Sequence, residues 1–178
     1  WVSISKGDDE FIVATRMGMA IRFKESDVRV MGRTARGVKA MDLSEGDEII
    51  GLEKIREGAL LLTVTEQGYG RRTDPDEYRL IHRGGKGVTN YKQVAERGSV
   101  VGIKMVDENE DVILITTDGV IIRTPASEIS KQSRYGSGVT VMKTTGESRV
   151  VTVAAAPQEP QDENSADEEK EEPESQEE

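Results

Sequence analysis

The sequence of this chain repeats three times, at a step of about fifty residues. Segments aligned on Thr15, Thr65 and Thr116 carry the same residue types in one register, with spacings of 50 and then 51 residues. A period of this length indicates a propeller or solenoid array, in which each unit packs on the next. The other matching positions are Gly18, Gly68 and Gly119; Arg22, Arg72 and Arg123; Asp27, Glu77 and Glu128; Arg33, Arg83 and Arg134; and Gly37-Val38, Gly87-Val88 and Gly138-Val139.

Each copy holds four short runs with the composition of β-strands, separated by Gly or charged turns. Four strands in about 50 residues match the size of one propeller blade. We therefore expect an all-β, propeller-like disc of repeated four-stranded blades, here about three blades, with Trp1–Ser5 as the edge strand of a preceding one. The predicted repeats span residues 8–56, 57–107 and 108–155, and the second should contain strands at Ala59–Thr65, Gly70–Thr73, Gly87–Tyr91 and Ser99–Val106.

Charge divides the chain into a neutral body and an acidic tail. The net charge is −10, and residues 157–178 contain eleven acids and one base, which leaves 23 acids and 23 bases in the rest. The tail is nearly free of aliphatic side chains, so it cannot offset its ordering entropy by burial. We predict a domain over residues 1–155 and a disordered acidic tail over 156–178 that competes with other polyanions for the cations of the body.

Composition also excludes several functional classes. The chain has no Cys and a single His, His82, which excludes a disulfide framework, a thiol nucleophile and a multi-histidine metal centre. Its longest apolar runs are far shorter than a membrane span, and its start does not read as a signal peptide. We expect a piece of a longer, cytoplasmic protein, without a membrane partner.

Each copy has a basic segment just before or around its third run, and these segments lack acids. The segments are residues 31–39, 79–92 and 131–143, called the basic segments below. In a circular array equivalent residues occupy equivalent places, so the segments should form a discontinuous positive belt suited to the phosphates of double-stranded DNA. Exposed polar turns without a ligand are the alternative. The candidate DNA-binding residues are Arg33, Arg36, Lys39, Arg79, Arg83, Lys86, Lys92, Lys131, Arg134 and Lys143.

The chain shows no pattern for catalysis. The stretch Gly84–Gly87 resembles a phosphate-binding loop, but the Ser or Thr that should follow Lys86 is absent. The acidic stretch 107–111 lacks the glycine of a calcium loop. We therefore expect no catalytic residue, no metal site and no cofactor within this chain.

The repeat motif resembles a known family. Thr-x-x-Gly-x-x-x-Arg after a β-run, an acidic position, and then an Arg before Gly-Val are similar to the C-terminal DNA-wrapping domain of the DNA gyrase A subunit, from the type IIA topoisomerases; the likeness covers residues 1–155. The gyrase heptapeptide, Gln-Arg-Arg-Gly-Gly-Lys-Gly, matches residues 81–87 at its last five positions.

The resemblance implies a β-pinwheel that wraps DNA and supports ATP-dependent negative supercoiling by the whole enzyme. It places the catalytic residues, ATP and Mg²⁺ outside this chain, and it implies a bacterial, nucleoid-associated protein. It also implies two partners in an A2B2 heterotetramer, which are the gyrase B subunit plus the N-terminal core of the A subunit. A topoisomerase IV domain that discriminates DNA geometry, or a propeller that binds other proteins, remain alternatives.

Overall fold

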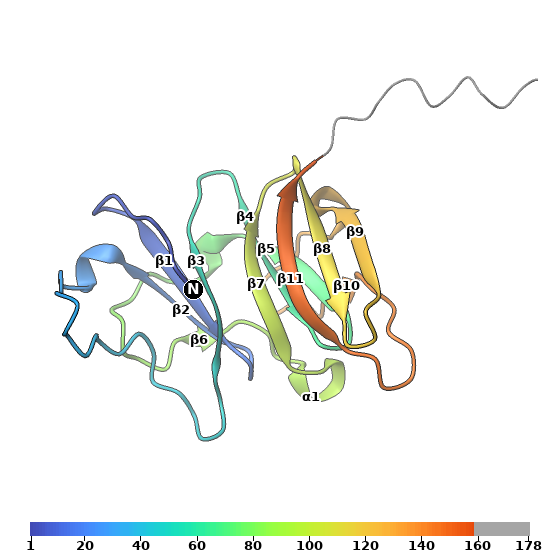
Figure 1. Cartoon of the computed structure of the whole chain (residues 1–178), viewed down its shortest axis with the longest axis horizontal. Helices are drawn as coiled ribbons and strands as arrows, with labels where there is room; N and C mark the ends of the chain where they lie inside the picture. Colours follow the sequence, from blue (N-terminus) through green and yellow to red (C-terminus); the bar gives the residue numbers. More distant parts are fainter. Residues whose placement is uncertain (159–178) are drawn as a thin grey trace, which may run out of the picture.

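Three antiparallel sheets pack side by side in the protein (Figure 1). The structure is a computed structural model, and it describes residues 1–158. The strand orders are β3-β1-β2-β6, β10-β5-β4-β7 and β11-β8-β9. The all-β, propeller-like fold expected from the repeat is confirmed. The strands are β1 Glu10–Thr15, β2 Met19–Lys24, β3 Ile49–Lys54, β4 Leu60–Thr65, β5 Tyr69–Thr73, β6 Val88–Thr89, β7 Val100–Val106, β8 Glu110–Thr116, β9 Ile121–Pro125, β10 Val139–Thr140 and β11 Val150–Pro157.

The shared spacing of Thr and Gly within each copy builds the same tight hairpin three times. In the first, the Gly18 amide donates to the Thr15 carbonyl at 3.0 Å, and the Met19 amide donates to the Thr15 hydroxyl at 3.1 Å. Gly18 has φ +82°, a left-handed conformation that glycine adopts without a side-chain clash. Gly68 and Gly119 take the same conformation in the β4–β5 and β8–β9 turns.

The repeats exchange one strand with each other. Strand β6 belongs to the second repeat but pairs with β2, with Val88 opposite Ala20. Strand β10 belongs to the third repeat but pairs with β5, with Val139 opposite Gly70. The expectation that the four strands of one copy form one blade is therefore wrong in this respect. Each complete sheet takes its outermost strand from the following copy.

Two apolar layers hold the sheets together. Ile12 of β1 and Leu61 of β4 are buried in the layer between the first and second sheets, and Leu62 and Leu114 in the layer between the second and third. Strand β7 contacts both β3 and β11 across the sheets. We call their side the inner edge, and the side of β6 and β10 the outer edge.

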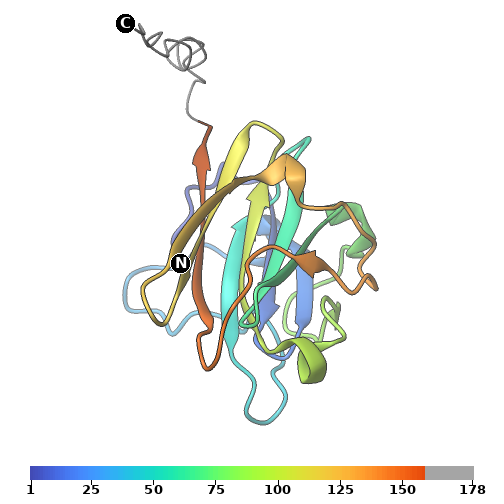
Figure 2. The same cartoon turned by 90° about the vertical axis from the view of Figure 1, so that its right-hand side faces the viewer.

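The ends of the array differ from the expectation. Trp1–Ser5 forms no strand, and the third run of the first repeat, at Gly37-Val38, forms none either. The third sheet has three strands, so its β9 edge carries no exchanged strand within residues 1–158 (Figure 2). The predicted acidic tail lies almost entirely outside the described residues. The helical elements are the short α1 at Val94–Arg97 and 3₁₀ turns at Glu25–Asp27, Pro75–Glu77 and Ala126–Glu128.

Candidate nucleic-acid interface

The first two basic segments lie against each other at the outer edge. The Gly84 amide donates to the Ala40 carbonyl at 2.7 Å, and the Asp42 amide donates to the Gly85 carbonyl at 2.9 Å. The glycines make this close approach possible, because Gly84 has φ +86°. The segment that resembles the gyrase heptapeptide is therefore placed beside the equivalent segment of the preceding repeat.

The third basic segment continues the row. The Tyr91 hydroxyl donates to the Ser137 carbonyl at 2.6 Å, and the Arg134 guanidinium donates to the Thr89 carbonyl at 2.6 Å. Each segment thus touches the one before it. The structure brings the three predicted basic segments together in one contiguous row along the outer edge, which we call the basic belt.

Most of the predicted DNA-binding side chains in the belt face solvent. Eight of the ten are exposed, and the other two, Arg83 and Arg134, are half-buried. Two of the exposed ones are engaged with acids: Lys39 lies 2.8 Å from Asp42 and Lys131 lies 3.1 Å from Asp74. The hydrogen bond from Lys39 lowers the pKa of Asp42. The six exposed cations without an ion pair within residues 1–158 are Arg33, Arg36, Arg79, Lys86, Lys92 and Lys143.

Arg83 and Arg134 have an internal role that their recurrence in the sequence did not reveal. The Arg83 guanidinium donates to the Lys39 carbonyl at 3.0 Å and to the Asp27 carbonyl at 2.9 Å. Lys39 and Thr89 occupy equivalent repeat positions, so Arg83 and Arg134 make the same contact one repeat apart. Both arginines tie a basic segment to its predecessor. Their equivalent, Arg33, makes no side-chain hydrogen bond within residues 1–158.

A buried arginine supports the belt from below. Arg71 on β5 is fully buried, and its guanidinium donates to the Ser133 carbonyl at 3.0 Å, to the Arg134 carbonyl at 2.8 Å and to the Asn90 carbonyl. It also lies 4.9 Å from the centre of the Tyr91 ring, a cation–π contact. Burial lowers the pKa of Arg71. The equivalent residues are isoleucines, Ile21 and Ile122, and this charged residue at an apolar repeat position was the available sequence signal.

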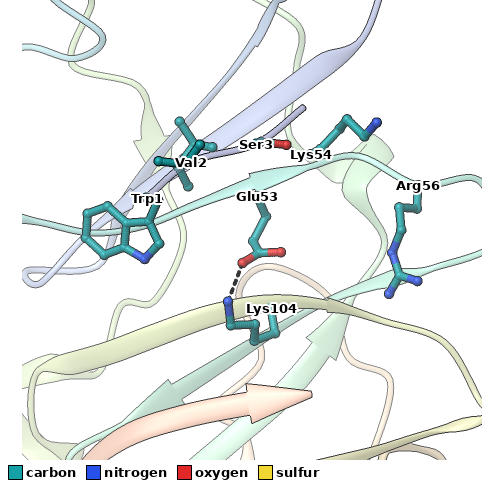
Figure 3. Close-up of a pocket in the computed structure, with 8 residues that line it drawn as sticks. Trp1, Val2, Ser3, Glu53, Lys54, Arg56 and Lys104 are labelled. Atoms are coloured by element: carbon teal, nitrogen blue, oxygen red, sulfur yellow. Dashed lines mark hydrogen bonds and ion pairs between the residues drawn. The ribbon is translucent and has the colours of Figure 1, made fainter. Parts of the chain in front are cut away.

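Acidic side chains on the opposite side are engaged in ion pairs between repeats. Glu53 on β3 forms an ion pair with Lys104 on β7 (Figure 3), with the Lys104 Nζ 2.7 Å from the Glu53 Oε1. This pair lines a pocket of about 300 Å³ together with Trp1 and Arg56. Arg56 in turn reaches Glu110 at 2.6 Å. These carboxylates are paired at the inner edge, while exposed cations without ion pairs lie at the outer edge.

Other kinds of site find little support in the described part of the chain. Residues 1–158 contain no group of three or more His, Cys, Asp or Glu side chains placed to hold a metal ion. No helix among them has the length and apolar character needed to span a bilayer.

Together, the exchanged strands and the belt define a strand-exchanged propeller domain with a basic outer edge. The sequence matches the family described as DNA gyrase C-terminal domain, beta-propeller, over residues 9–56, 59–107 and 110–157. The chain belongs to this family.

Known relatives agree with the assignment. The chain is 39% identical to the DNA gyrase A subunit of Staphylococcus aureus (strain NCTC 8325 / PS 47) over 169 residues, which are 94% of this chain and 19% of that protein. A solved DNA gyrase A C-terminal domain superposes with a TM-score of 0.77 and 32% identity, covering 83% of this chain and 50% of that one. A topoisomerase IV C-terminal domain superposes with a TM-score of 0.79 and 26% identity, covering 85% and 47%. The chain thus spans about a fifth of its curated relatives and half of the solved domains.

Proposed function

We propose that this chain binds double-stranded DNA along the basic belt and wraps it around the outer edge. The observation that carries the proposal is the contiguity of the three basic segments, which places exposed cations of three repeats in one row. A duplex presents phosphates at regular intervals, and a curved row of cations can neutralise successive ones while the DNA bends.

The chemistry of the belt fits phosphate contacts rather than base readout. Six of its cations are exposed without an ion pair within residues 1–158, so they are available to an anion. Gly85 is exposed, and there is open space where its side chain would be, so a phosphate can approach the backbone there. Contacts of this kind bind DNA with little sequence preference and release counterions.

The salt dependence of binding tests the belt directly. The triple variant Arg36→Gln, Lys86→Gln, Lys143→Gln removes one exposed cation from each basic segment. Each lost phosphate contact reduces the slope of log K against log salt by about 0.9, so three lost contacts make it shallower by about 2.7. We expect this change in fluorescence-anisotropy titrations of a long duplex across a range of salt concentrations.

A matched control removes three cations outside the basic segments. Lys6, Lys24 and Arg29 are exposed and form no ion pair within residues 1–158, so Lys6→Gln, Lys24→Gln, Arg29→Gln changes the net charge equally. It should leave the slope near that of the wild type. If both triple variants change the slope alike, only the overall charge matters and the belt is not the interface.

Wrapping, as distinct from binding, changes the linking number of closed DNA. Nicked circular plasmid ligated in the presence of the chain should show a shift of one sign, which grows with the protein-to-DNA ratio. Binding at low salt without a shift would show that the chain binds the duplex but does not wrap it.

Within a whole enzyme, we propose that this wrapping supports ATP-dependent negative supercoiling by a gyrase-type topoisomerase in the bacterial cytoplasm. Its partners would be the B subunit of gyrase and the N-terminal core of the gyrase A chain, where ATP and Mg²⁺ would act. The identity to gyrase A sequences favours this function, while the superposition on a topoisomerase IV domain favours the alternative of DNA-geometry discrimination. These two functions can be distinguished with a gyrase whose A chain carries this segment in place of its own matching segment. Supercoiling by that enzyme supports the gyrase role, and relaxation without supercoiling supports the role in DNA-geometry discrimination.

A further inference from the structure

The third basic segment carries an exposed aromatic side chain among its cations. Tyr135 is 63% exposed, and it directly follows Arg134, which ties this segment to the preceding repeat. The equivalent residues of the other two segments are Thr34 and Gly84, which offer little apolar surface. The belt thus combines exposed cations with an exposed tyrosine ring, and phosphate contacts give no role to that ring.

The backbone presents Tyr135 at the corner of a tight turn. The Gly136 amide donates to the Ser133 carbonyl at 2.8 Å, so Arg134 and Tyr135 are the two central residues of the turn. The buried Arg71 holds this turn from below, through its bonds to the Ser133 and Arg134 carbonyls at 3.0 and 2.8 Å. The turn therefore has a defined position on the sheet that supports it.

The Arg134 guanidinium fixes the ring itself. It lies 4.5 Å from the centre of the Tyr135 ring, a cation–π contact, and it donates to the Tyr135 hydroxyl at 2.8 Å. The guanidinium is held in turn by the Thr89 carbonyl at 2.6 Å, and the Arg134 amide donates to the Glu77 carboxylate at 2.7 Å. An exposed side chain normally loses rotamer freedom when it binds a ligand. The Tyr135 ring is already ordered, so it loses less.

These contacts leave apolar surface for a ligand. The Arg134 guanidinium lies over one face of the Tyr135 ring and engages its hydroxyl, so the opposite face and the ring edge remain accessible. Such surface favours an apolar contact over a hydrogen bond. The bases of an intact duplex are stacked on one another, so the apolar groups that it offers lie in its grooves, on deoxyribose carbons and base edges.

Exposed cations come from both of the segments that meet near the ring. The Tyr91 hydroxyl donates to the carbonyl of Ser137, two residues after Tyr135, and this bond joins the second segment to the third. Lys92 follows Tyr91 in the second segment, and Lys131 precedes the turn in the third; both are exposed. Phosphates bound by these cations would bring the surface of a duplex to the ring.

We propose that Tyr135 packs against deoxyribose and base edges in one groove of the bound duplex, as an apolar contact within an otherwise ionic interface. The proposal rests on the proposed function of the basic belt, and it adds a contact that phosphate binding does not include. Ionic contacts weaken with salt because they release counterions, whereas burial of apolar surface does not depend on them. Tyr135 should therefore contribute a similar factor to the affinity at every salt concentration.

The salt dependence of binding separates the two kinds of contact. Tyr135→Ala should weaken binding of the long duplex by about tenfold at every salt concentration, because one aromatic face is no longer buried. The line of log K against log salt should move down with an unchanged slope, unlike that of the triple variant in the basic segments. Tyr135→Phe keeps the ring and should bind like the wild type.

Trp1→Ala is the matched control. Trp1 is an aromatic residue of similar exposure, 68%, and it lines the pocket at the inner edge, away from the belt. Its loss should leave the line unchanged, and circular dichroism checks that all variants are folded.

The outcomes distinguish this contact from the belt as a whole. If the wild type binds with a steep salt dependence and Tyr135→Ala coincides with it, the belt stands and the proposed Tyr135 contact fails. A shallower slope in Tyr135→Ala also overturns the contact, because the ring would then act by holding the Arg134 charge in place. A wild type whose binding is insensitive to salt refutes the belt, and the Tyr135 contact with it.

A fluorescent probe tests the location of the contact. Trp1 is the single native tryptophan, so Trp1→Phe combined with Tyr135→Trp moves the only indole to the turn. Duplex binding should reduce the quenching of this indole by acrylamide, because the groove covers it. The wild type, whose Trp1 lies outside the belt, should show no change. Equal protection of the two indoles, or protection of neither, overturns the proposed contact.

Discussion

Substitution of equivalent glycines offers a sharp test of what strand exchange contributes to stability. Gly68 and Gly119 occupy the same position of the same turn, with φ +78° and +82°. They differ in surroundings, because Met142, just after β10, passes over Gly68 and nothing lies within 4 Å of the equivalent position at Gly119. Alanine at the two positions therefore imposes the same local strain but different tertiary costs.

The magnitudes follow from the contacts. A left-handed conformation costs an alanine about 1–2 kcal/mol, and the stiffer unfolded chain offsets part of it. Gly119→Ala should therefore lower the free energy of unfolding by about 1 kcal/mol. Gly68→Ala must also displace the Met142 carbonyl, which sacrifices the bonds from the Val141 and Met142 amides at 2.9 and 3.1 Å to the Gly68 carbonyl. At about 1 kcal/mol each, these bring its total to about 3 kcal/mol.

The assay is equilibrium urea unfolding followed by circular dichroism, at dilutions where light scattering shows single chains. Working with single chains removes any contribution from association to the measured stability. Gly68→Ala should unfold at clearly lower urea than Gly119→Ala, with an unchanged slope. Equal losses for the two variants would mean that the exchanged strand does not press on the turn, and the reasoning would fail.

Three further predictions concern the belt, the core and the tail. Arg134→Gln should lower the free energy of unfolding by about 2 kcal/mol, because it removes the charged hydrogen bond to the preceding repeat, whereas Arg33→Gln should leave the stability of single chains unchanged. Burial raises the pKa of Tyr78 to about 12, so a neutral tyrosine favours the folded state. Stability should hold below pH 10 and fall by up to about 3 kcal/mol as the pH rises towards 12, and Tyr78→Phe should flatten this part of the pH profile. Deleting residues 157–178, which hold eleven acids, should strengthen DNA binding at low salt and have little effect at high salt, as measured by anisotropy.

The local structure was predictable because the composition of a few neighbouring residues is enough to indicate each strand. The expected strands Ala59–Thr65 and Ser99–Val106 agree closely with Leu60–Thr65 and Val100–Val106. The Thr-x-x-Gly spacing also fixes the hairpin turns, since it depends on one glycine conformation. What the sequence did not reveal is which sheet the short Val88–Thr89 strand joins. A period of fifty residues is the same whether a blade is made of one repeat or two.

The contact between successive basic segments was predictable from the repeat, whereas the structural role of each cation in them was not. In the sequence, the exposed Lys86 and Arg83 are both cations of the same basic segment, although only Arg83 ties that segment to the preceding repeat. The difference depends on carbonyl groups far along the chain, such as that of Lys39, whose direction no local pattern encodes. The supporting role of Arg71 could not be predicted from the repeat, because a single charged residue at a normally apolar position has no counterpart in the other copies.

The exchange of strands also bears on how such a chain can change its length. The second repeat donates β6 to the first sheet and receives β10 at β5. In an array of such repeats, removing the residues between two equivalent positions leaves the numbers of donated strands and receiving edges balanced. Such a deletion need not respect a sheet boundary: a cut within one hairpin rejoined to the same point of the next restores a regular array. The architecture thus allows whole repeats to be lost or duplicated in a single genetic event without creating an unmatched junction inside the molecule.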